Sequence, residues 1–170
     1  IMIDKNKICY IFDMDGTLTK PREPMMKKHK DIFLEWAKEK QCFISTGSDY
    51  SKVVEQLDKE IIDCFNLVFC CMGNEARDTA GNIVRKNHFI VPEDLNIDLA
   101  NFMETSGYKT RAGQHFEVRT GMLNFSIVGR LASQKQRVHY YEWDKKHNER
   151  RKIANFINKR YPELEASVGG

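Results

Sequence analysis

The sequence predicts an α/β fold in two parts, with a parallel-sheet core first and an α+β unit with antiparallel strands after it. Short apolar runs rich in β-forming residues alternate with helical patterns in the first half, which is typical of a parallel sheet. The second half carries alternating strand patterns around a two-residue turn, which are typical of antiparallel pairs. Hydrophobic residues make up 41% and charged residues 30% of the 170 residues, as in globular proteins.

The first half has the order strand, helix, strand, helix, strand. The strands are expected at residues 8–12, 42–45 and 67–70, each a short apolar run. The helices are expected over about 25–40 and 49–57, where apolar residues recur at helical spacing. These apolar residues are Ile32, Phe33, Trp36 and Ala37 in the first helix and Val53, Val54 and Leu57 in the second. Right-handed crossovers would place the strands in one parallel sheet.

The pattern changes after Gly73. Residues 76–86 predict a hairpin that turns at Ala-Gly-Asn, and residues 95–106 predict a helix. Strands are expected at 115–118 and 122–128, around Thr-Gly. A charged segment with sparse apolar residues then predicts one long helix over 135–161.

These patterns divide the chain into the first part of the core, residues 1–80, and the α+β unit, residues 81–170. The segment 167–170 should belong to another strand. Three parallel strands make a small sheet for an α/β core. We therefore expect the rest of the core beyond residue 170.

Composition argues against several classes of protein. The formal net charge of +3 is too small to predict nucleic-acid binding. No apolar run approaches the roughly 18 residues that suggest a membrane span, and residues 1–7 lack the apolar core of a signal peptide. The cysteines form no CxxC pair, which favours buried, reduced thiols in a cytoplasmic protein. They are Cys9, Cys42, Cys64, Cys70 and Cys71.

Two carboxylates follow the first strand, in the segment 12–19 (FDMDGTLT). Open α/β sheets place their ligand sites at the carboxyl ends of strands, and Gly16 permits a sharp turn there. One carboxylate can attack phosphorus, and the other can move the proton of the leaving oxygen. Mg²⁺ is the natural counter-charge. The alternative is that Asp13 and Asp15 only cap a loop, but DxDGT after an apolar strand is far more specific than a single Asp-Gly turn.

A second candidate site follows the second strand. The Thr46 hydroxyl and the amides of Gly47 and Ser48 could hold phosphoryl oxygens, although a turn with a helix cap would look the same. Lys52, one helical turn later, could face this site or solvent.

Four arginines are candidates for holding a phosphate, because guanidinium pairs with phosphate through two hydrogen bonds. Each could also be an ordinary surface charge. They are Arg22, Arg119, Arg130 and Arg137. The five histidines show no metal-like pairing, and we interpret them as surface or interface residues.

The segment 12–19 resembles the first signature of the haloacid dehalogenase superfamily of phosphatases and phosphomutases. Further segments are similar to the eukaryotic-type phosphomannomutases in order and spacing, so the resemblance runs from about residue 8 to residue 170. These segments are 15–22 (DGTLTKPR), 47–52 (GSDYSK), 55–57 (EQL), 116–124 (FEVRTGMLN), 128–130 (VGR), Arg137 and 142–146 (EWDKK).

The resemblance implies a Rossmann-like core of the haloacid dehalogenase type, incomplete here, with an α+β cap. It implies a phosphohexomutase that interconverts the 6-phosphate and 1-phosphate of mannose or glucose, with Asp13 as nucleophile and Asp15 as general acid/base. Both aspartates would bind Mg²⁺, and hexose 1,6-bisphosphate would be the activator. Family members act in GDP-mannose biosynthesis and form homodimers through the cap.

The resemblance also implies substrate contacts. The four arginines would gather the distal phosphate and sugar, with Met122 and Asn124 beside that pocket. A mutase needs such a remote phosphate site because either end of the sugar must reach the same aspartyl phosphate while water is kept out.

Two departures from the family pattern leave alternatives open. The family's Glu-Asn-Gly after the third strand reads Cys71-Met72-Gly73 here, and the Asn after Arg119 is Thr120. The family's Ser and Asp sugar contacts, its phosphoaspartate lysine and its acidic magnesium loop would lie beyond residue 170. One alternative is a sugar-phosphate phosphatase on the same scaffold. The other is an inactive binding or regulatory relative. The residues do not distinguish mannose from glucose.

Overall fold

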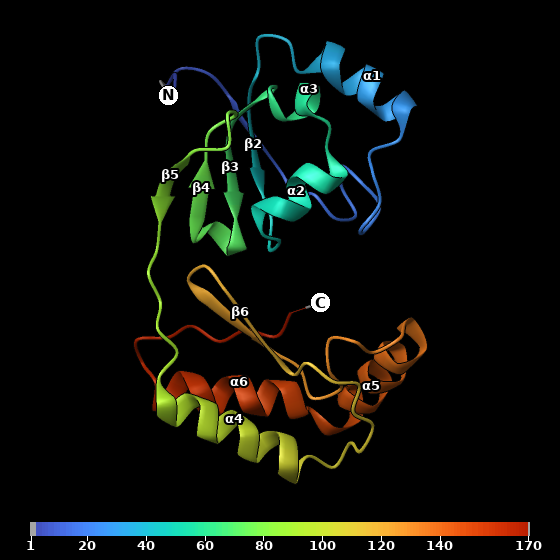
Figure 1. Cartoon of the computed structure of the whole chain (residues 1–170), viewed down its shortest axis with the longest axis vertical. Coiled ribbons are helices and arrows are strands. Elements are labelled where there is room, and N and C mark those ends of the chain that lie inside the picture. The colour runs from blue at the N-terminus through green and yellow to red at the C-terminus, as the bar shows by residue number, and fades with distance from the viewer. Residues whose placement is uncertain (1–2, 170) are drawn as a thin grey trace. The chain divides into compact units, whose positions relative to one another are not determined.

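The computed structural model describes residues 3–169 and forms two compact units (Figure 1). The first unit consists of Ile1–Phe89 together with Arg119–Met122. The second consists of Ile90–Val118 and Leu123–Gly170. Each unit has a hydrophobic core of its own.

A five-stranded sheet forms the centre of the first unit. Its strands lie in the order β1 (Cys9–Phe12), β2 (Gln41–Ser45), β3 (Phe65–Cys70), β4 (Glu75–Arg77) and β5 (Ile83–Lys86). β1, β2 and β3 are parallel, as the sequence predicts, whereas β4 and β5 are antiparallel to their neighbours. Because β1 and β2 are parallel neighbours, the segments that follow them leave the same edge of the sheet.

The predicted hairpin adds to this same sheet. β4 pairs with β3, with Val68 opposite Arg77 and Cys70 opposite Glu75. This pairing explains why the first compact unit reaches Phe89, beyond the boundary expected at residue 80.

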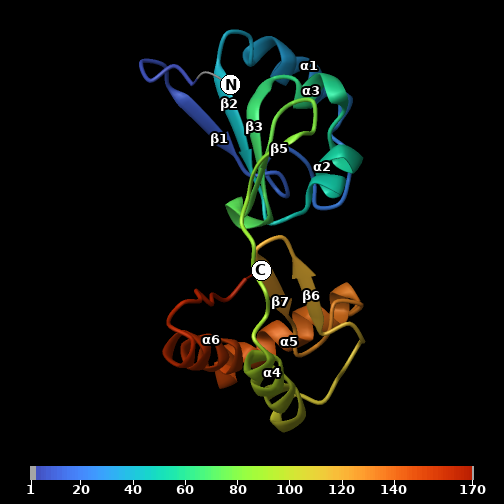
Figure 2. The same cartoon turned by 60° about the vertical axis from the view of Figure 1, so that its left-hand side comes forward.

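Three helices lie to one side of the sheet in both views: α1 (Lys27–Trp36), α2 (Tyr50–Gln56) and α3 (Lys59–Ile62) (Figures 1 and 2). They bury one apolar stripe each against β1, β2 and β3. Two positions assigned to these stripes are wrong. Ile32 is 68% exposed and Val54 is 49% exposed, because the helices turn other residues toward the sheet.

The second unit packs three helices with a two-stranded hairpin. Its elements are α4 (Glu93–Thr105), β6 (Phe116–Arg119), β7 (Met122–Phe125), α5 (Gln134–His147) and α6 (Glu149–Arg160). The hairpin turn is counted with the first unit. A core of aliphatic and aromatic side chains joins α4, α5 and α6 to the strands.

Two expectations for the C-terminal part are wrong. The predicted helix over 135–161 is two helices, because Asn148 adopts a left-handed conformation with φ of 54°. Asn tolerates this conformation well, and its amide closes α5 on the Asp144 carbonyl at 2.7 Å. Residues 167–169 form no strand, and Gly170 lies outside the described residues.

The cysteines are free thiols. Cys42, Cys70 and Cys71 are buried as expected, whereas Cys64 is half-buried and Cys9 is exposed on the edge strand β1. Within residues 3–169, no helix is long and apolar enough to span a membrane.

Candidate active site

The carboxylate segment forms a tight loop at the end of β1. Met14 is fully buried and anchors the loop, and its carbonyl accepts from the amides of Leu18 and Thr19, both at 3.0 Å. Gly16 has φ of 85°, in the region that glycine adopts without strain, and its amide donates to the Thr19 carbonyl at 2.7 Å. The loop therefore holds Asp13 and Asp15 on either side of a buried anchor.

A buried hydrogen bond ties this loop to α2. The Thr19 hydroxyl donates to Gln56 Oε1 at 2.9 Å, and both residues are buried. A buried amide oxygen that lost this donor would cost about 1–3 kcal/mol. The pair thus fixes the loop against the helix that follows the second candidate segment.

Hydrogen bonds orient both carboxylates. The Met14 amide donates to Asp13 Oδ1 at 2.8 Å, and Asp13 as a whole is exposed. Asp15 Oδ1 accepts from the Arg22 amide at 3.3 Å, and Oδ2 accepts from the Ser48 hydroxyl at 3.4 Å. The structure therefore brings Asp15 and Ser48 together, although they are 33 residues apart in the chain.

The segment Thr46-Gly47-Ser48, hereafter the phosphate loop, is held by its own polar groups. Thr46 is buried and its amide donates to the Phe69 carbonyl at 2.9 Å. The Ser48 amide donates to the Thr46 hydroxyl at 3.1 Å. Thr46 thus holds the loop by hydrogen bonds from a buried position, whereas Gly47 and Ser48 are half-buried.

A strained turn after β3 supports the phosphate loop. Cys71, Met72 and Gly73 all have positive φ, of 51°, 57° and 83°. Two consecutive non-glycine residues in this region are unfavourable by about 1–2 kcal/mol each. The turn is held because the Met72 amide donates to the Thr46 carbonyl at 3.0 Å and the Cys71 amide to the Ser48 carbonyl at 2.9 Å.

Met72 is the exposed residue of this turn. Its side chain is 68% exposed, and its sulfur would lie 3.3 Å from a Cβ placed on Gly47. The sequence shows that the turn departs from the family pattern, but not that its thioether covers the phosphate loop.

Asp49 begins α2 directly after the phosphate loop. Its carboxylate accepts from the Ser51 hydroxyl at 2.5 Å and from the Lys52 amide at 3.1 Å. The hydrogen bond from Ser51 is the main cause that lowers the pKa of Asp49, and the charge of Arg119 acts in the same direction. The Lys52 ammonium pairs instead with Glu55 at 2.7 Å, so the structure does not bring it to the phosphate loop.

Of the predicted arginines, Arg119 lies at the phosphate loop. Its Nη1 donates to the Gly47 carbonyl at 2.5 Å. Met122 packs against the core of the first unit. Arg22 is exposed, and its backbone rather than its guanidinium is what contacts Asp15.

The other substrate candidates lie in the second unit around Glu117, which sequence reasoning missed. Glu117 Oε2 accepts from Asn124 at 3.2 Å and pairs with Arg130 Nε at 2.9 Å. Arg137 donates from Nη2 to the Arg130 carbonyl, which places the two arginines together. The signal that could have found Glu117 is its position on a strand directly opposite Asn124, across a two-residue turn.

Asp13 and Asp15 fit a magnesium ion in the chemistry of their donors. Both supply hard carboxylate oxygens, and Mg²⁺ is commonly bound by one or two carboxylates together with substrate phosphates. Within residues 3–169 no cluster of three or more His, Cys, Asp or Glu side chains is arranged to hold a metal.

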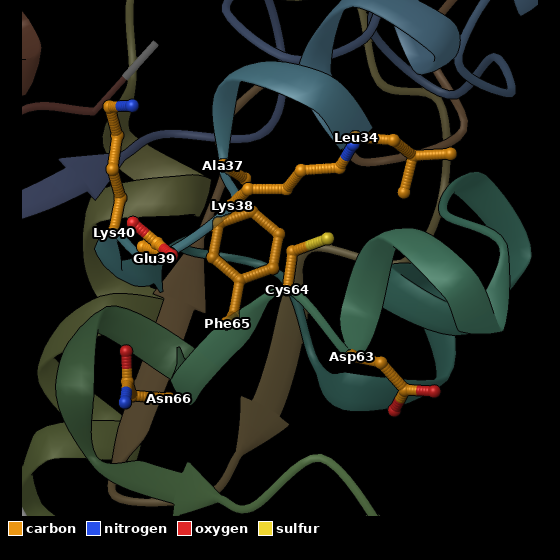
Figure 3. A pocket seen from close by; sticks show the side chains of 9 residues that line it. All are labelled: Leu34, Ala37, Lys38, Glu39, Lys40, Asp63, Cys64, Phe65 and Asn66. Atoms are coloured by element: carbon orange, nitrogen blue, oxygen red, sulfur yellow. The ribbon is translucent and has the colours of Figure 1, made fainter.

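A recess of about 350 Å³ lies elsewhere on the first unit (Figure 3). It is lined by the end of α1, the residues before β2 and the start of β3. None of the candidate site residues lines it, and it lies at the opposite ends of the strands from the carboxylates.

Comparison with known proteins supports this reading of the residues. A family model described as "Eukaryotic phosphomannomutase" matches residues 30–170. A phosphomannomutase of Dendrobium officinale is 32% identical, over 94% of this chain and 66% of its own length. Phosphomannomutase 1 of Mus musculus is 33% identical, over 98% of this chain and 67% of its own length. The chain thus spans about two-thirds of the length of these relatives.

A solved structure agrees at the level of the fold. An IMP-nucleotidase of Plasmodium falciparum has a TM-score of 0.53 and 12% sequence identity, and the match covers 91% of this chain and 47% of that one. At this identity the likeness concerns the arrangement of the elements alone.

Proposed function

Because the chain belongs to the eukaryotic phosphomannomutase family, within the haloacid dehalogenase superfamily, we propose that it interconverts mannose or glucose 6-phosphate and 1-phosphate through a phosphate on Asp13. The observation that carries this proposal is the Asp13–Asp15 loop at the end of β1, with the Ser48 hydroxyl on Asp15.

Asp13 is the nucleophile. The bond from the Met14 amide to Oδ1 orients its carboxylate, one oxygen of which attacks phosphorus. The new Asp13–phosphorus bond forms as the bond between phosphorus and the sugar oxygen breaks, which leaves an aspartyl phosphate and a sugar hydroxyl. The exposure of Asp13 gives the phosphate access to this oxygen.

Asp15 is the general acid and base. Held by Ser48 and by the Arg22 amide, it protonates the leaving sugar oxygen in the first step. In the second step it takes the proton from the free hydroxyl at C1 or C6 of a bound hexose monophosphate. That oxygen bonds to the phosphorus on Asp13 as the bond between phosphorus and Asp13 breaks, which gives the hexose 1,6-bisphosphate. The phosphate thereby returns to a sugar and Asp13 is regenerated.

Asp13 and Asp15 would also hold Mg²⁺. When bound, the ion neutralises charge on the transferring phosphate and on the two carboxylates. The phosphate loop would supply its Ser48 hydroxyl and Gly47 amide to the phosphoryl oxygens.

The arginines would bind the remainder of the substrate. In line with the family resemblance, we propose that the distal phosphate and the sugar are bound by Arg119, Met122, Asn124, Arg130 and Arg137. A guanidinium fork holds phosphate in one orientation, which a mutase needs for two productive binding modes. Arg22 is the remaining candidate for this role.

Other properties follow from family membership. We propose that the first unit begins a haloacid dehalogenase core, which extends to Phe89 rather than to the expected residue 80. We propose that the second unit forms its cap and that the rest of the core lies beyond residue 170. We further propose a homodimer formed through the cap, hexose 1,6-bisphosphate as activator and a cytoplasmic location in GDP-mannose synthesis. The free thiols are consistent with a reducing compartment. Light scattering after size exclusion tests the dimer, because a monomeric mass would contradict it.

Phosphorus NMR tests the proposed reaction. The longest available form of the protein is supplied with Mg²⁺, mannose 1-phosphate and a catalytic amount of hexose 1,6-bisphosphate, with Asp13→Asn as the control. Mannose 6-phosphate should accumulate with the unaltered protein only. Accumulation of free phosphate instead would identify a phosphatase. No turnover of either mannose or glucose phosphates would leave the inactive binding relative.

A further inference from the structure

A buried carboxylate that the proposed reaction does not use lies behind the phosphate loop. Glu75, on β4, is 5% exposed. Its Oε1 pairs with Arg77 Nε at 2.6 Å, and its Oε2 accepts from the Thr120 hydroxyl at 3.0 Å. A charge in such a place is costly unless its oxygens are hydrogen-bonded. Both carboxylate oxygens of Glu75 are bonded, and the partner of Oε2 belongs to a distant part of the sequence.

The Arg77 side of this network is fixed within the sheet. The Arg77 guanidinium lies over the ring of Tyr50 at 4.8 Å, and its Nη1 donates to the Gly81 carbonyl at 2.7 Å. Tyr50 is the first residue of α2, directly after Asp49. Glu75 is therefore held from one side by a rigid group that connects β4 to α2.

The Thr120 side holds the turn of the β6–β7 hairpin. Besides the hydroxyl contact with Glu75, the Thr120 backbone lies near the Cys71 thiol: burial raises the pKa of this thiol, and the Thr120 backbone acts in the opposite direction. The next residue, Gly121, has φ of 67°, and a Cβ there would lie 2.5 Å from Cγ of Asn74. The turn thus contacts the segment from Cys71 to Glu75 at three points.

The residue before this turn is Arg119, which reaches the phosphate loop. Its Nη1 donates to the Gly47 carbonyl at 2.5 Å. The carbonyls on either side of Gly47 accept from the amides of the Cys71–Met72 turn. All three carbonyls of the phosphate loop are therefore bonded on one side, and Arg119 supplies the middle contact.

We propose that Glu75 is a positioning residue, which fixes Thr120 and thereby sets the Arg119 guanidinium on the Gly47 carbonyl beside the catalytic loop. The turn is only two residues long, and the bond from the Thr120 hydroxyl to Glu75 fixes it directly beside Arg119. A hydrogen bond to an ionised carboxylate is stronger than one to a neutral group. The effect of the Arg119 position on catalysis rests on the proposed function, but the role of Glu75 in fixing that position does not.

Thiol reactivity measures whether the turn is docked, without any need for activity. Cys71 is 2% exposed, and the Thr120 backbone lies near its thiol. Alkylation with iodoacetamide, resolved by mass spectrometry, reports how often Cys71 becomes accessible. Cys9 is exposed and reports complete reaction, whereas Cys42, buried elsewhere in the same core, reports global unfolding.

Two substitutions of one residue separate the hydroxyl from the rest of the side chain. Thr120→Val should raise the alkylation rate of Cys71 about tenfold or more, because it removes a hydrogen bond to a charged group, while the rate at Cys42 stays unchanged. Thr120→Ser keeps the hydroxyl and should restore the low rate. Thr105→Val removes a comparable hydroxyl bond, at 2.7 Å to Asn101 in α4, and should leave Cys71 unaffected.

A second variant tests the carboxylate. Glu75→Gln keeps an acceptor for Thr120 but removes the charge, and should raise the Cys71 rate by a smaller factor than Thr120→Val. Where phosphoryl transfer is measured, Thr120→Val should raise KM severalfold more than it lowers kcat, and Thr120→Ser should restore KM. Equal Cys71 rates in Thr120→Val and unaltered protein would overturn the proposal. If the unaltered protein shows no phosphoryl transfer, the proposed function is refuted, but the alkylation result for Cys71 remains valid.

Discussion

Replacing Gly129 by alanine should destabilise the second unit strongly. Gly129 has φ of 92°, where an L-residue is strained. A Cβ at this position would also meet the backbone of the neighbouring segment: the Gly113 carbonyl oxygen, the Ala112 carbon at 2.8 Å and the Ala112 oxygen at 2.9 Å. Backbone hydrogen bonds hold the two segments together, among them the bond from the Ala112 amide to the Val128 carbonyl at 2.8 Å.

The expected cost has two parts. Placing alanine at a positive φ costs about 1–2 kcal/mol. Forcing an extra methyl group into a packed site costs a further 1–3 kcal/mol or so, since backbone rather than a flexible side chain must move. The sum is roughly 2–5 kcal/mol. Gly113→Ala is the matched control, because its φ of 54° carries the same kind of strain while its Cβ would meet only the end of the Leu131 side chain, at 3.3 Å. That variant should lose about 1–2 kcal/mol.

The two tryptophans allow each unit to be followed separately. Trp36 lies in α1 and Trp143 in α5. In a Trp36→Phe background, the fluorescence of Trp143 reports urea unfolding of the second unit alone. At a slope of about 2 kcal/mol per molar urea, Gly129→Ala should lower the midpoint by about 1–2.5 M and by clearly more than Gly113→Ala.

Equal losses in the two variants would refute this reasoning. Such a result would mean that the backbone at Ala112 and Gly113 yields to a methyl group at position 129, so the strained φ alone would set the cost.

Three further predictions concern the site and the core. Glu117→Ala should raise KM for the phosphosugar more than it lowers kcat, because Arg130 loses the carboxylate that orients it, and Glu117→Gln should be milder; unchanged steady-state kinetics would contradict this. Thr19→Val should cost the first unit about 1–3 kcal/mol in urea unfolding, because it leaves the buried Gln56 oxygen without its donor; a loss below 0.5 kcal/mol or so would count against it. Burial raises the pKa of Cys70 to about 12 from 9.0. Between these pH values the folded thiol keeps a proton that the unfolded chain releases, so the free energy of unfolding should fall as pH rises from 9.0 to about 12. Cys70→Ala should reduce that fall.

The sequence predicts the carboxylate loop after the first strand well, because local chemistry decides its form. An apolar strand followed by DxDGT can form few other loops, and the structure places Asp13 and Asp15 around the buried Met14 as such a loop requires. The parallel order of the first three strands also follows from the alternation of strand and helix patterns. Ser48 could be assigned to the same place because it follows the neighbouring strand.

The remainder depends on contacts between residues far apart in the chain. The break at Asn148 was missed, because the flanking segments are both strongly helical and one asparagine carries little signal. The left-handed turn at Cys71 and Met72 could not be predicted, because those residue types disfavour the conformation that their backbone bonds to the phosphate loop impose. Periodicity alone does not show which of two adjacent apolar residues faces the core: Ile32 is exposed, whereas Phe33 is buried.

The acidic residues behind the site show the same limit. Glu75 in a short strand and Glu117 in a hairpin look like ordinary solvent-facing charges in the sequence. Only the fold shows that Glu75 is buried and accepts from the Thr120 hydroxyl, and that Glu117 pairs with Arg130. The sequence marked the arginines that a phosphate would need, but not the carboxylates that orient them.

Trapping the covalent intermediate tests the central claim most directly. The protein is incubated with Mg²⁺ and hexose 1,6-bisphosphate, quenched in acid and reduced with borohydride, which converts an aspartyl phosphate to homoserine. Peptide mass spectrometry then locates the modified residue. We expect homoserine at position 13 of the unaltered protein and none in Asp13→Asn. Modification at another residue, or turnover that persists in Asp13→Asn, would contradict the assignment of Asp13 as the nucleophile.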